Sequence, residues 1–398
     1  MKINLDKIID RKGTGSMKWD LADRLYQGEN LLPLWVADMD FLAPAEIIEA
    51  IKNRAEHGIF GYPVHTSDVD RAVQKWVKRH FHWEIEEKTI LFTPGVVPTI
   101  AQIIQEFTEE NDEIIIQPPV YPPFFQLVTN FNRTLLENPL RYENGKYTID
   151  FEHLESIITP KTKMLLLCSP HNPVGRVWLK EELKKLAEIC EKYNLLIVSD
   201  EIHADLTYEG HAHIPIASLT KEISERTITL LAPTKTFNMA AFQISYCIIE
   251  NKSLYERIER RLRKQFLHMT NLFGELVTKV AYTHGDAWLN EVRKYVQKNY
   301  EFTKSFLEKR MPEISIVEPE GTYLLWLDFS KLPLTASERK KWLIHEAKVA
   351  LNHGPTFGKE GEHFERMNIA CSQETLKEGL ERIERAYQKL LLKKGCHS

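Results

Sequence analysis

The stretch Leu-Leu-Ile-Val-Ser-Asp-Glu-Ile-His, residues 195–203, decides the fold class. It begins as a short apolar run without the polar alternation of a half-exposed strand, and it ends in two acids and a histidine. Amphipathic stretches such as 181–193 separate it from comparable runs at 113–116, 164–168, 227–231 and 245–249. Strands that are apolar throughout are buried on both faces. The pattern therefore predicts an α/β core in which helices flank a mostly parallel sheet.

A different pattern follows residue 285. It predicts helices over 287–310, 336–347 and 373–392, with short strands at 315–317, 322–328 and 367–370. Such a mixture is typical of a smaller α+β lobe, and the first forty-odd residues could fold back against it. Because the chain exceeds the size of a single core, we expect a large domain over 45–285 and a small domain built from 1–44 and 286–398. Residues 254–282 predict one long helix leaving the core.

The charge balance limits the classes of partner. Lys and Arg number 52 and Asp and Glu 56, and the net charge of −4 leaves no basic excess for nucleic acid or an anionic membrane. Small molecules are therefore the expected partners. Acids near the N-terminus, with no long apolar window in the chain, predict a cytoplasmic protein. The cysteines lack Cys-x-x-Cys spacing, which predicts reduced thiols and no metal site: 168, 190, 247, 371 and 396.

Polar residues follow three of the expected strands. Asn172 comes shortly after the run 164–168, and Asp200 directly follows 195–199. Lys235 comes shortly after the run 227–231. In open α/β sheets ligands bind outside the carboxyl ends of the strands, so we expect the three side chains to converge on one crevice.

An amine, a carboxylate and an amide are the groups with which an enzyme holds pyridoxal phosphate and exploits it as an electron sink. Lys235 could form a Schiff base with that aldehyde and act as a general base, since desolvation lowers the pKa of a lysine. Asp200 could pair with a protonated pyridine nitrogen, and Asn172 could donate to the phenolate oxygen. The ordinary alternatives are a surface turn for the lysine, a helix N-cap for the aspartate and an Asn-Pro turn for the asparagine. Their common placement favours the cofactor.

Three further features fit the same cofactor. His203 could contact the phenolate oxygen or tune the Schiff base, or be a satisfied core histidine. The free N–H groups of Val96 and Val97, at the start of an expected helix, would face a phosphate; the alternative is an ordinary Pro-Gly turn. Tyr121 lies on a proline-rich segment and could stack on the cofactor ring or be a core aromatic.

Several motifs resemble those of the fold-type I pyridoxal phosphate enzymes, and within them the MalY/PatB group of cystathionine β-lyases, also called C–S lyases. The resemblance runs essentially from end to end. Its motifs are Leu-Pro-Leu-Trp-Val-Ala-Asp-Met-Asp-Phe (32–41), Gly-Ile-Phe-Gly-Tyr-Pro (58–63), 93–97, 169–177, Ser-Asp-Glu-Ile-His (199–203), Lys-Thr-Phe-Asn (235–238), Pro-Glu-Gly-Thr-Tyr (319–323) and Arg-Met-Asn (366–368). The first, fifth and sixth of these look like the lyase group in particular.

The resemblance implies a role for each matching residue. Lys235 would carry the cofactor and act as the Cα base, Asp200 would be the pyridinium partner, and Asn172 and His203 would neighbour the phenolic oxygen. Tyr121 would stack on the ring.

Two further positions extend the resemblance beyond the cofactor ring. Arg366 would grip the substrate α-carboxylate. Tyr62 matches a tyrosine lent to the neighbouring subunit's cofactor phosphate, which implies an obligate homodimer with shared sites. Many relatives place a serine and an arginine where this chain has Ala232 and Gln243, so Thr234 is the nearest hydroxyl for the phosphate.

The function that this resemblance implies is β-elimination from a sulfur amino acid such as cystathionine or cysteine, giving pyruvate, ammonia and a thiol. An aminotransferase uses the same groups and remains an alternative, as does a lyase with an additional regulatory binding role. Tyr323, Trp35, Trp288 and the turn 354–358 either line the side-chain pocket or are packing residues.

Overall fold

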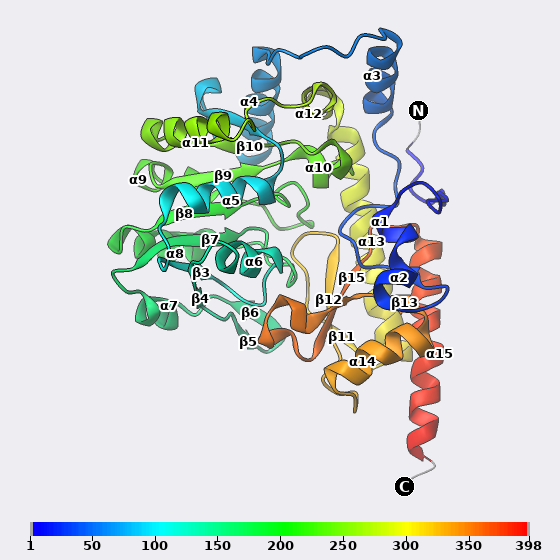
Figure 1. The fold of residues 1–398 in the computed structure, drawn as a ribbon. Helices are drawn as coiled ribbons and strands as arrows, with labels where there is room; N and C mark the ends of the chain where they lie inside the picture. Colours follow the sequence, from blue (N-terminus) through cyan, green and yellow to red (C-terminus); the bar gives the residue numbers. More distant parts are fainter. Residues whose placement is uncertain (1–2, 396–398) are drawn as a thin grey trace.

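The computed structural model describes residues 3–395, and its centre is a seven-stranded sheet (Figure 1). The strands run in the order β2 (Ile90–Thr93), β10 (Ser245–Ile248), β9 (Thr227–Leu231), β8 (Leu196–Asp200), β7 (Thr162–Cys168), β3 (Glu113–Ile116) and β4 (Thr134–Glu137). β10 is antiparallel to both of its neighbours, and the other neighbouring pairs are parallel. The expected α/β core with a mostly parallel sheet is confirmed.

Helices pack on both faces of this sheet (Figure 1). Between residues 45 and 284 the chain forms α3 (Ala45–Glu56), α4 (Ser67–Phe81), α5 (Val96–Phe107), α6 (Pro123–Thr129), α7 (Phe151–Ile157), α8 (Lys180–Lys192), α9 (Lys221–Ser224), α10 (Pro233–Thr236), α11 (Lys252–Lys264), α12 (Leu272–His284) and a hairpin of β5 (Arg141–Glu143) and β6 (Lys146–Thr148). Ile114 and Ile116 of β3 pack in one cluster with residues of α5, α6 and α11, whereas Ile115 packs with residues of α8. Successive strand residues point to opposite faces, which is why these strands are apolar throughout.

The single long helix expected over 254–282 is wrong, because the chain forms two helices there. α11 ends at Lys264, and Phe266 has a left-handed backbone with a φ of 57°. The Asn271 side chain then accepts a hydrogen bond from the Gly274 N–H at 2.6 Å and caps α12. Asparagine is a preferred N-cap residue, so it starts a new helix where apolar periodicity alone indicates a continuous one.

The C-terminal part of the chain forms a smaller antiparallel sheet with its own helices. Its strands run in the order β11 (Ser315–Ile316), β12 (Leu324–Asp328), β15 (Phe364–Asn368) and β14 (Asn352–His353). The helices of this part are α13 (Asp286–Arg310), α14 (Ala336–Trp342), a π-helical turn at Leu343–Ala347 and α15 (Gln373–Gly395). The strand expected at 367–370 lies three residues earlier, where β15 pairs with the full length of β12.

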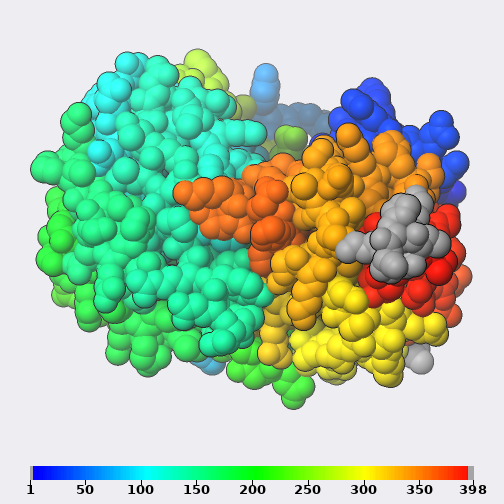
Figure 2. Space-filling view, turned by 90° about the horizontal axis from the view of Figure 1, so that it is seen from below, coloured from blue at the N-terminus to red at the C-terminus, as the bar shows by residue number. Residues whose placement is uncertain are grey.

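The N-terminal segment lies beside these C-terminal elements. In Figure 1, α1 (Met17–Asp20) and α2 (Ala22–Tyr26) lie next to β13 (Val349–Ala350), and Figure 2 shows the blue N-terminal part on the same side as the orange and red C-terminal part. β1 (Leu32–Pro33) pairs in parallel with β13. The domain boundaries at residues 44 and 285 stay a prediction, and the ends at 1–2 and 396–398 lie outside the described residues.

Within residues 3–395, none of the helices combines the length and apolar character needed to cross a membrane. The described side chains also form no cluster of three or more His, Cys, Asp or Glu residues that could hold a metal ion. Cys168, Cys190, Cys247 and Cys371 are buried free thiols, whereas Cys396 lies beyond the described part of the chain.

Candidate active site

A cavity of about 250 Å³ opens at the carboxyl ends of β7, β8 and β9 and reaches the smaller sheet. Most of the predicted site residues line it: Val96, Val97, Tyr121, Asn172, Asp200, His203, Lys235 and Arg366. The strand order explains this convergence, because β7, β8 and β9 are parallel neighbours that end at one edge. Arg366 reaches the same cavity from β15.

Lys235 lies on α10, one short turn beyond β9, and faces the cavity. Its Nζ donates a hydrogen bond to the backbone oxygen of Ala37 at 2.6 Å. Burial and the nearby Arg366 charge lower the pKa of Lys235 to about 8, against the opposing influence of Asp38 and Asp200. A lysine with such a pKa is a competent nucleophile and general base near neutral pH.

Asp200 is the last residue of β8 and is almost fully buried. Burial raises the pKa of its carboxyl to about 7, although the Ile202 N–H donates to Oδ1 at 3.2 Å and Lys235 lies near. A cationic group placed against this carboxylate would restore its ionised form, since opposite charge favours ionisation. The site therefore suits a ligand that carries positive charge at this end.

Arg366 is buried, and its guanidinium is held by neutral oxygens. Nη1 donates to Asn172 Oδ1 at 2.9 Å, and Nη2 donates to Asn352 Oδ1 at 2.5 Å and to the Trp35 backbone oxygen at 3.1 Å. Burial lowers the pKa of this guanidinium to about 10, which leaves it charged at neutral pH. No carboxylate contacts it among the described residues, so a ligand carboxylate could take that place.

His203 and Tyr121 lie on the cavity wall with different chemistry. Burial, together with the Lys235 and Arg366 charges, lowers the pKa of His203 to about 3, so its imidazole is neutral. Its Nδ1 is buried without a hydrogen-bond partner among the described residues. Burial raises the pKa of Tyr121, which keeps that phenol protonated. Both groups are available to a ligand in the cavity.

Of the four residues predicted to bind the phosphate, two line the cavity and two do not. Gly95, with a φ of 143°, precedes α5, so the N–H groups of Val96 and Val97 belong to the positive end of a helix at the cavity wall. Thr234 is buried on α10 but does not line the cavity. Tyr62 is 92% exposed and lies outside the cavity of its own chain. The roles assigned to these residues stay predictions.

Other cavity residues escaped the sequence analysis. Asn352 from β14 and Ala37 from the segment after β1 line the cavity, as does Met17 of α1. Of the candidate side-chain pocket residues, Trp35 lines it. Tyr323, Trp288 and the turn 354–358 do not. Trp35 and Ala37 lie within the motif 32–41, whereas no local pattern points to Met17 or Asn352, which come from a four-residue helix and a two-residue strand.

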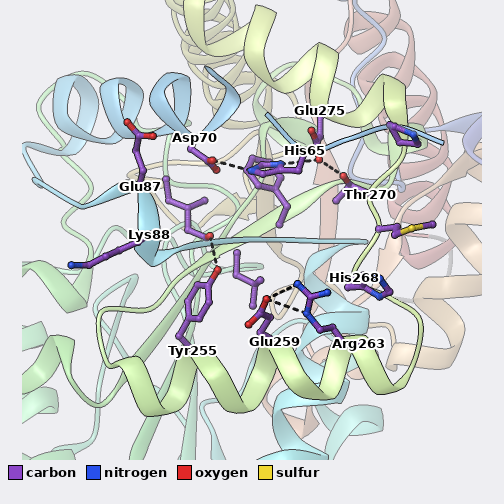
Figure 3. Close-up of a pocket in the computed structure, with 15 residues that line it drawn as sticks. His65, Asp70, Glu87, Lys88, Tyr255, Glu259, Arg263, His268, Thr270 and Glu275 are labelled. Atoms are coloured by element: carbon purple, nitrogen blue, oxygen red, sulfur yellow. Dashed lines mark hydrogen bonds and ion pairs between the residues drawn. The ribbon is translucent and has the colours of Figure 1, made fainter. Parts of the chain in front are cut away.

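A second pocket, of about 390 Å³, lies between α4, β2, α11 and α12, next to the segment that carries Tyr62 (Figure 3). His65 is placed between two carboxylates there, with Nε2 2.8 Å from Asp70 and Nδ1 3.0 Å from Glu275. These two hydrogen bonds raise the pKa of His65 to about 10, so it is an imidazolium at neutral pH. These two contacts, called the His65 clamp below, hold the end of residues 58–65 against α4 and α12. Residues 58–65 are called the Tyr62 segment below.

A mostly parallel sheet with a buried lysine, carboxylate and arginine around one cavity is an arrangement suited to amino-acid chemistry on an aldehyde cofactor. The chain belongs to the aminotransferase class I and II family, whose model matches residues 29–383. It is 41% identical to the cystathionine beta-lyase PatB of Bacillus subtilis, over 96% of this chain and 100% of PatB.

Two solved structures extend this likeness. Cystalysin from Treponema denticola, a structure that contains pyridoxal 5'-phosphate, is 38% identical with a TM-score of 0.95, over 98% of this chain and 100% of that one. The PLP-bound C–S lyase from Staphylococcus hominis is 31% identical with a TM-score of 0.90, over 97% and 98% of the two chains. The family resemblance predicted from the motifs is confirmed.

Proposed function

We propose that this protein is a pyridoxal-phosphate-dependent carbon–sulfur lyase that converts S-substituted cysteine-type amino acids to pyruvate, ammonia and a thiol. The observation that carries the proposal is the convergence of Lys235, Asp200 and Arg366 on one cavity. Its relatives named as cystathionine beta-lyase and C–S lyase support elimination as the reaction. Cystathionine and cysteine are the proposed substrates.

The residues around the cavity fit the cofactor. Asp200 needs a cationic partner, which a protonated pyridine nitrogen supplies. The Asn172 oxygen is already bound by Arg366, so its amide N–H groups are free to face a phenolate, and His203 Nδ1 is a buried atom that lacks a partner in the described chain. Tyr121 would stack on the ring, and the start of α5 would hold the phosphate. When bound, the cofactor draws the electron pair left at Cα into its ring.

The residues of the cavity have separate roles in the reaction. Arg366 holds the substrate α-carboxylate with its planar fork and turns the Cα–H bond toward Lys235. The Lys235 amine takes the Cα proton, because its lowered pKa leaves much of it neutral near pH 8. The sulfur leaves Cβ as a thiolate with the bonding electron pair of the C–S bond and is protonated to the thiol. Water then hydrolyses the released three-carbon enamine to pyruvate and ammonia. Asp200 keeps its negative charge beside the pyridine nitrogen throughout.

The enzyme works as a homodimer with shared sites in this proposal. Tyr62 is 92% exposed, and the apolar side chains around it are also largely exposed: Ile59, Phe60 and Val64. Contiguous exposed apolar side chains mark interaction surfaces, and a second copy of the chain would cover these while placing Tyr62 at the partner's phosphate. The cytoplasm is the proposed location, where buried free cysteines stay reduced.

The deciding experiment identifies the products. The purified holoenzyme is incubated with cystathionine, cysteine or an S-alkyl cysteine, with and without a 2-oxo acid, and pyruvate and free thiol are measured. Elimination gives both products without the 2-oxo acid, and Lys235→Ala abolishes them. If the enzyme instead transfers the amino group and strictly requires a 2-oxo acid, the lyase proposal is wrong and the protein is an aminotransferase.

A further inference from the structure

Backbone carbonyls of residues 35–41, called the carbonyl segment below, accept hydrogen bonds from the charged side chains of the cavity. The oxygen of Ala37 accepts from Lys235 Nζ at 2.6 Å and from the Tyr323 hydroxyl at 2.9 Å. The oxygen of Trp35 accepts from Arg366 Nη2 at 3.1 Å. A carbonyl has two lone pairs, so the two donors use the full capacity of the Ala37 oxygen. The direction of the Lys235 amine therefore depends on where this backbone lies.

Two asparagines tie the carbonyl segment to the elements that carry those charged groups. Asn368, two residues beyond Arg366 on β15, donates to two carbonyls of the segment at 2.6 Å each. Asn238, three residues beyond Lys235, donates to two more at 2.8 and 2.9 Å. The segment is thus fixed from both sides of the cavity.

Cations of the N-terminal part hold the two carboxylates of the segment from outside the cavity. Lys18 has no exposed surface, and its Nζ lies 2.7 Å from Asp40 and 3.5 Å from Asp38. Arg11 lies 2.6 Å from Asp40 and 2.7 Å from Asp38, and Trp19 Nε1 donates to Asp40 at 2.9 Å. Lys18 is not among the residues that line the cavity.

We propose that Lys18 is a positioning residue for Lys235: its ion pair with Asp40 fixes the carbonyl segment, and the Ala37 oxygen of that segment orients the Lys235 amine. This inference rests on the proposed function in that Lys235 is the base. A fully buried ammonium carries a large desolvation cost and is tolerated only with well-placed partners, and in some proteins such a buried polar group specifies one arrangement.

The orientation matters because a neutral lysine amine has two N–H bonds and one lone pair. When one N–H is directed at the Ala37 oxygen, the lone pair that takes the Cα proton is restricted in direction. A displacement of about 1 Å in a reacting group lowers the rate roughly a hundredfold. Loosening the carbonyl segment therefore acts on kcat more than on KM.

Three variants of the holoenzyme test this role. Lys18→Met keeps an unbranched side chain as far as Cε and removes the charged ammonium group. Lys18→Met combined with Asp40→Asn also removes the carboxylate that Lys18 contacts, which Arg11 alone would otherwise neutralise. Leu186→Ala on α8, a buried residue outside the cavity, is the control for lost stability alone. For each we measure kcat, KM and the pH midpoint of the visible absorbance band of the bound cofactor.

Both Lys18 variants should lower kcat roughly ten- to a hundredfold with little change in KM, and should shift the absorbance midpoint, while Leu186→Ala keeps both values. If Lys18→Met does not fold, the kcat and the absorbance midpoint of the double variant alone decide the test. A kcat restored in the double variant would overturn the proposal, because the loss in Lys18→Met would then come from the excess negative charge of Asp40 and not from lost positioning. An unchanged kcat and midpoint in both would also overturn it. A wild-type holoenzyme without a visible band would overturn the proposed function as well.

Discussion

Replacing Arg366 by lysine should impair substrate use while leaving the cofactor bound. The guanidinium of Arg366 is fixed by hydrogen bonds to Asn172 at 2.9 Å and Asn352 at 2.5 Å, which sets its fork for a carboxylate. A lysine keeps the charge but cannot form two parallel hydrogen bonds. The lost charge-assisted bond is worth about 1.5–3 kcal/mol. At about 1.4 kcal/mol per tenfold, kcat/KM should fall about 10- to 150-fold.

The assay is pyruvate release from an S-alkyl cysteine by wild type and Arg366→Lys, with the visible absorbance band as a check on bound cofactor. The matched control is a substrate analogue without the α-carboxylate, on which both enzymes should be equally slow. A fall below about threefold would refute a carboxylate-binding role. An equal fall on the analogue would do the same, because the lost interaction would not involve the carboxylate.

Two remaining predictions concern the Tyr62 segment. Tyr62→Ala and Lys235→Ala, each nearly inactive alone, are refolded together in equal amounts. About half of the dimers are then hybrids with one intact shared site of two, so about a quarter of wild-type activity should return. No recovery would contradict a shared site. The pKa of His65 is raised from 6.5 to about 10 by its hydrogen bonds to Asp70 and Glu275, so its contribution to folding is complete below pH 6.5 and is lost as the pH rises toward 10. Thermal unfolding is measured between these pH values, and the Tm of the wild type should fall more with rising pH than the Tm of His65→Gln. Parallel plots of Tm against pH for the two proteins would refute the His65 clamp.

The sequence was sufficient to predict that Asn172, Asp200 and Lys235 line one cavity. Each follows a buried parallel strand, and parallel strands that are neighbours end at the same edge of a sheet. The apolar runs likewise predicted the sheet itself, since burial on both faces leaves no other pattern. Arg366 is different, because only its motif connected it to the site: it lies on a strand of the other sheet.

Other parts of the site leave no signature in the pattern of strands and helices. The Ala37 oxygen that binds Lys235 is a backbone atom, and any residue could supply it. Asn352 reaches Arg366 from a two-residue strand that is too short for a periodic pattern. The place of Tyr62 depends on a second chain in our proposal: only its motif (58–63) indicated that role, and a single subunit does not test it. The break before α12 depended on one capping side chain, that of Asn271.

The identity of the cofactor-bearing residue is the central claim. The holoenzyme is reduced with borohydride, digested, and examined by mass spectrometry for the peptide that carries the reduced cofactor. We predict that the label is found on Lys235 alone and that Lys235→Ala takes up none. A label on another lysine, or a wild-type chain that takes up no label, would contradict the account.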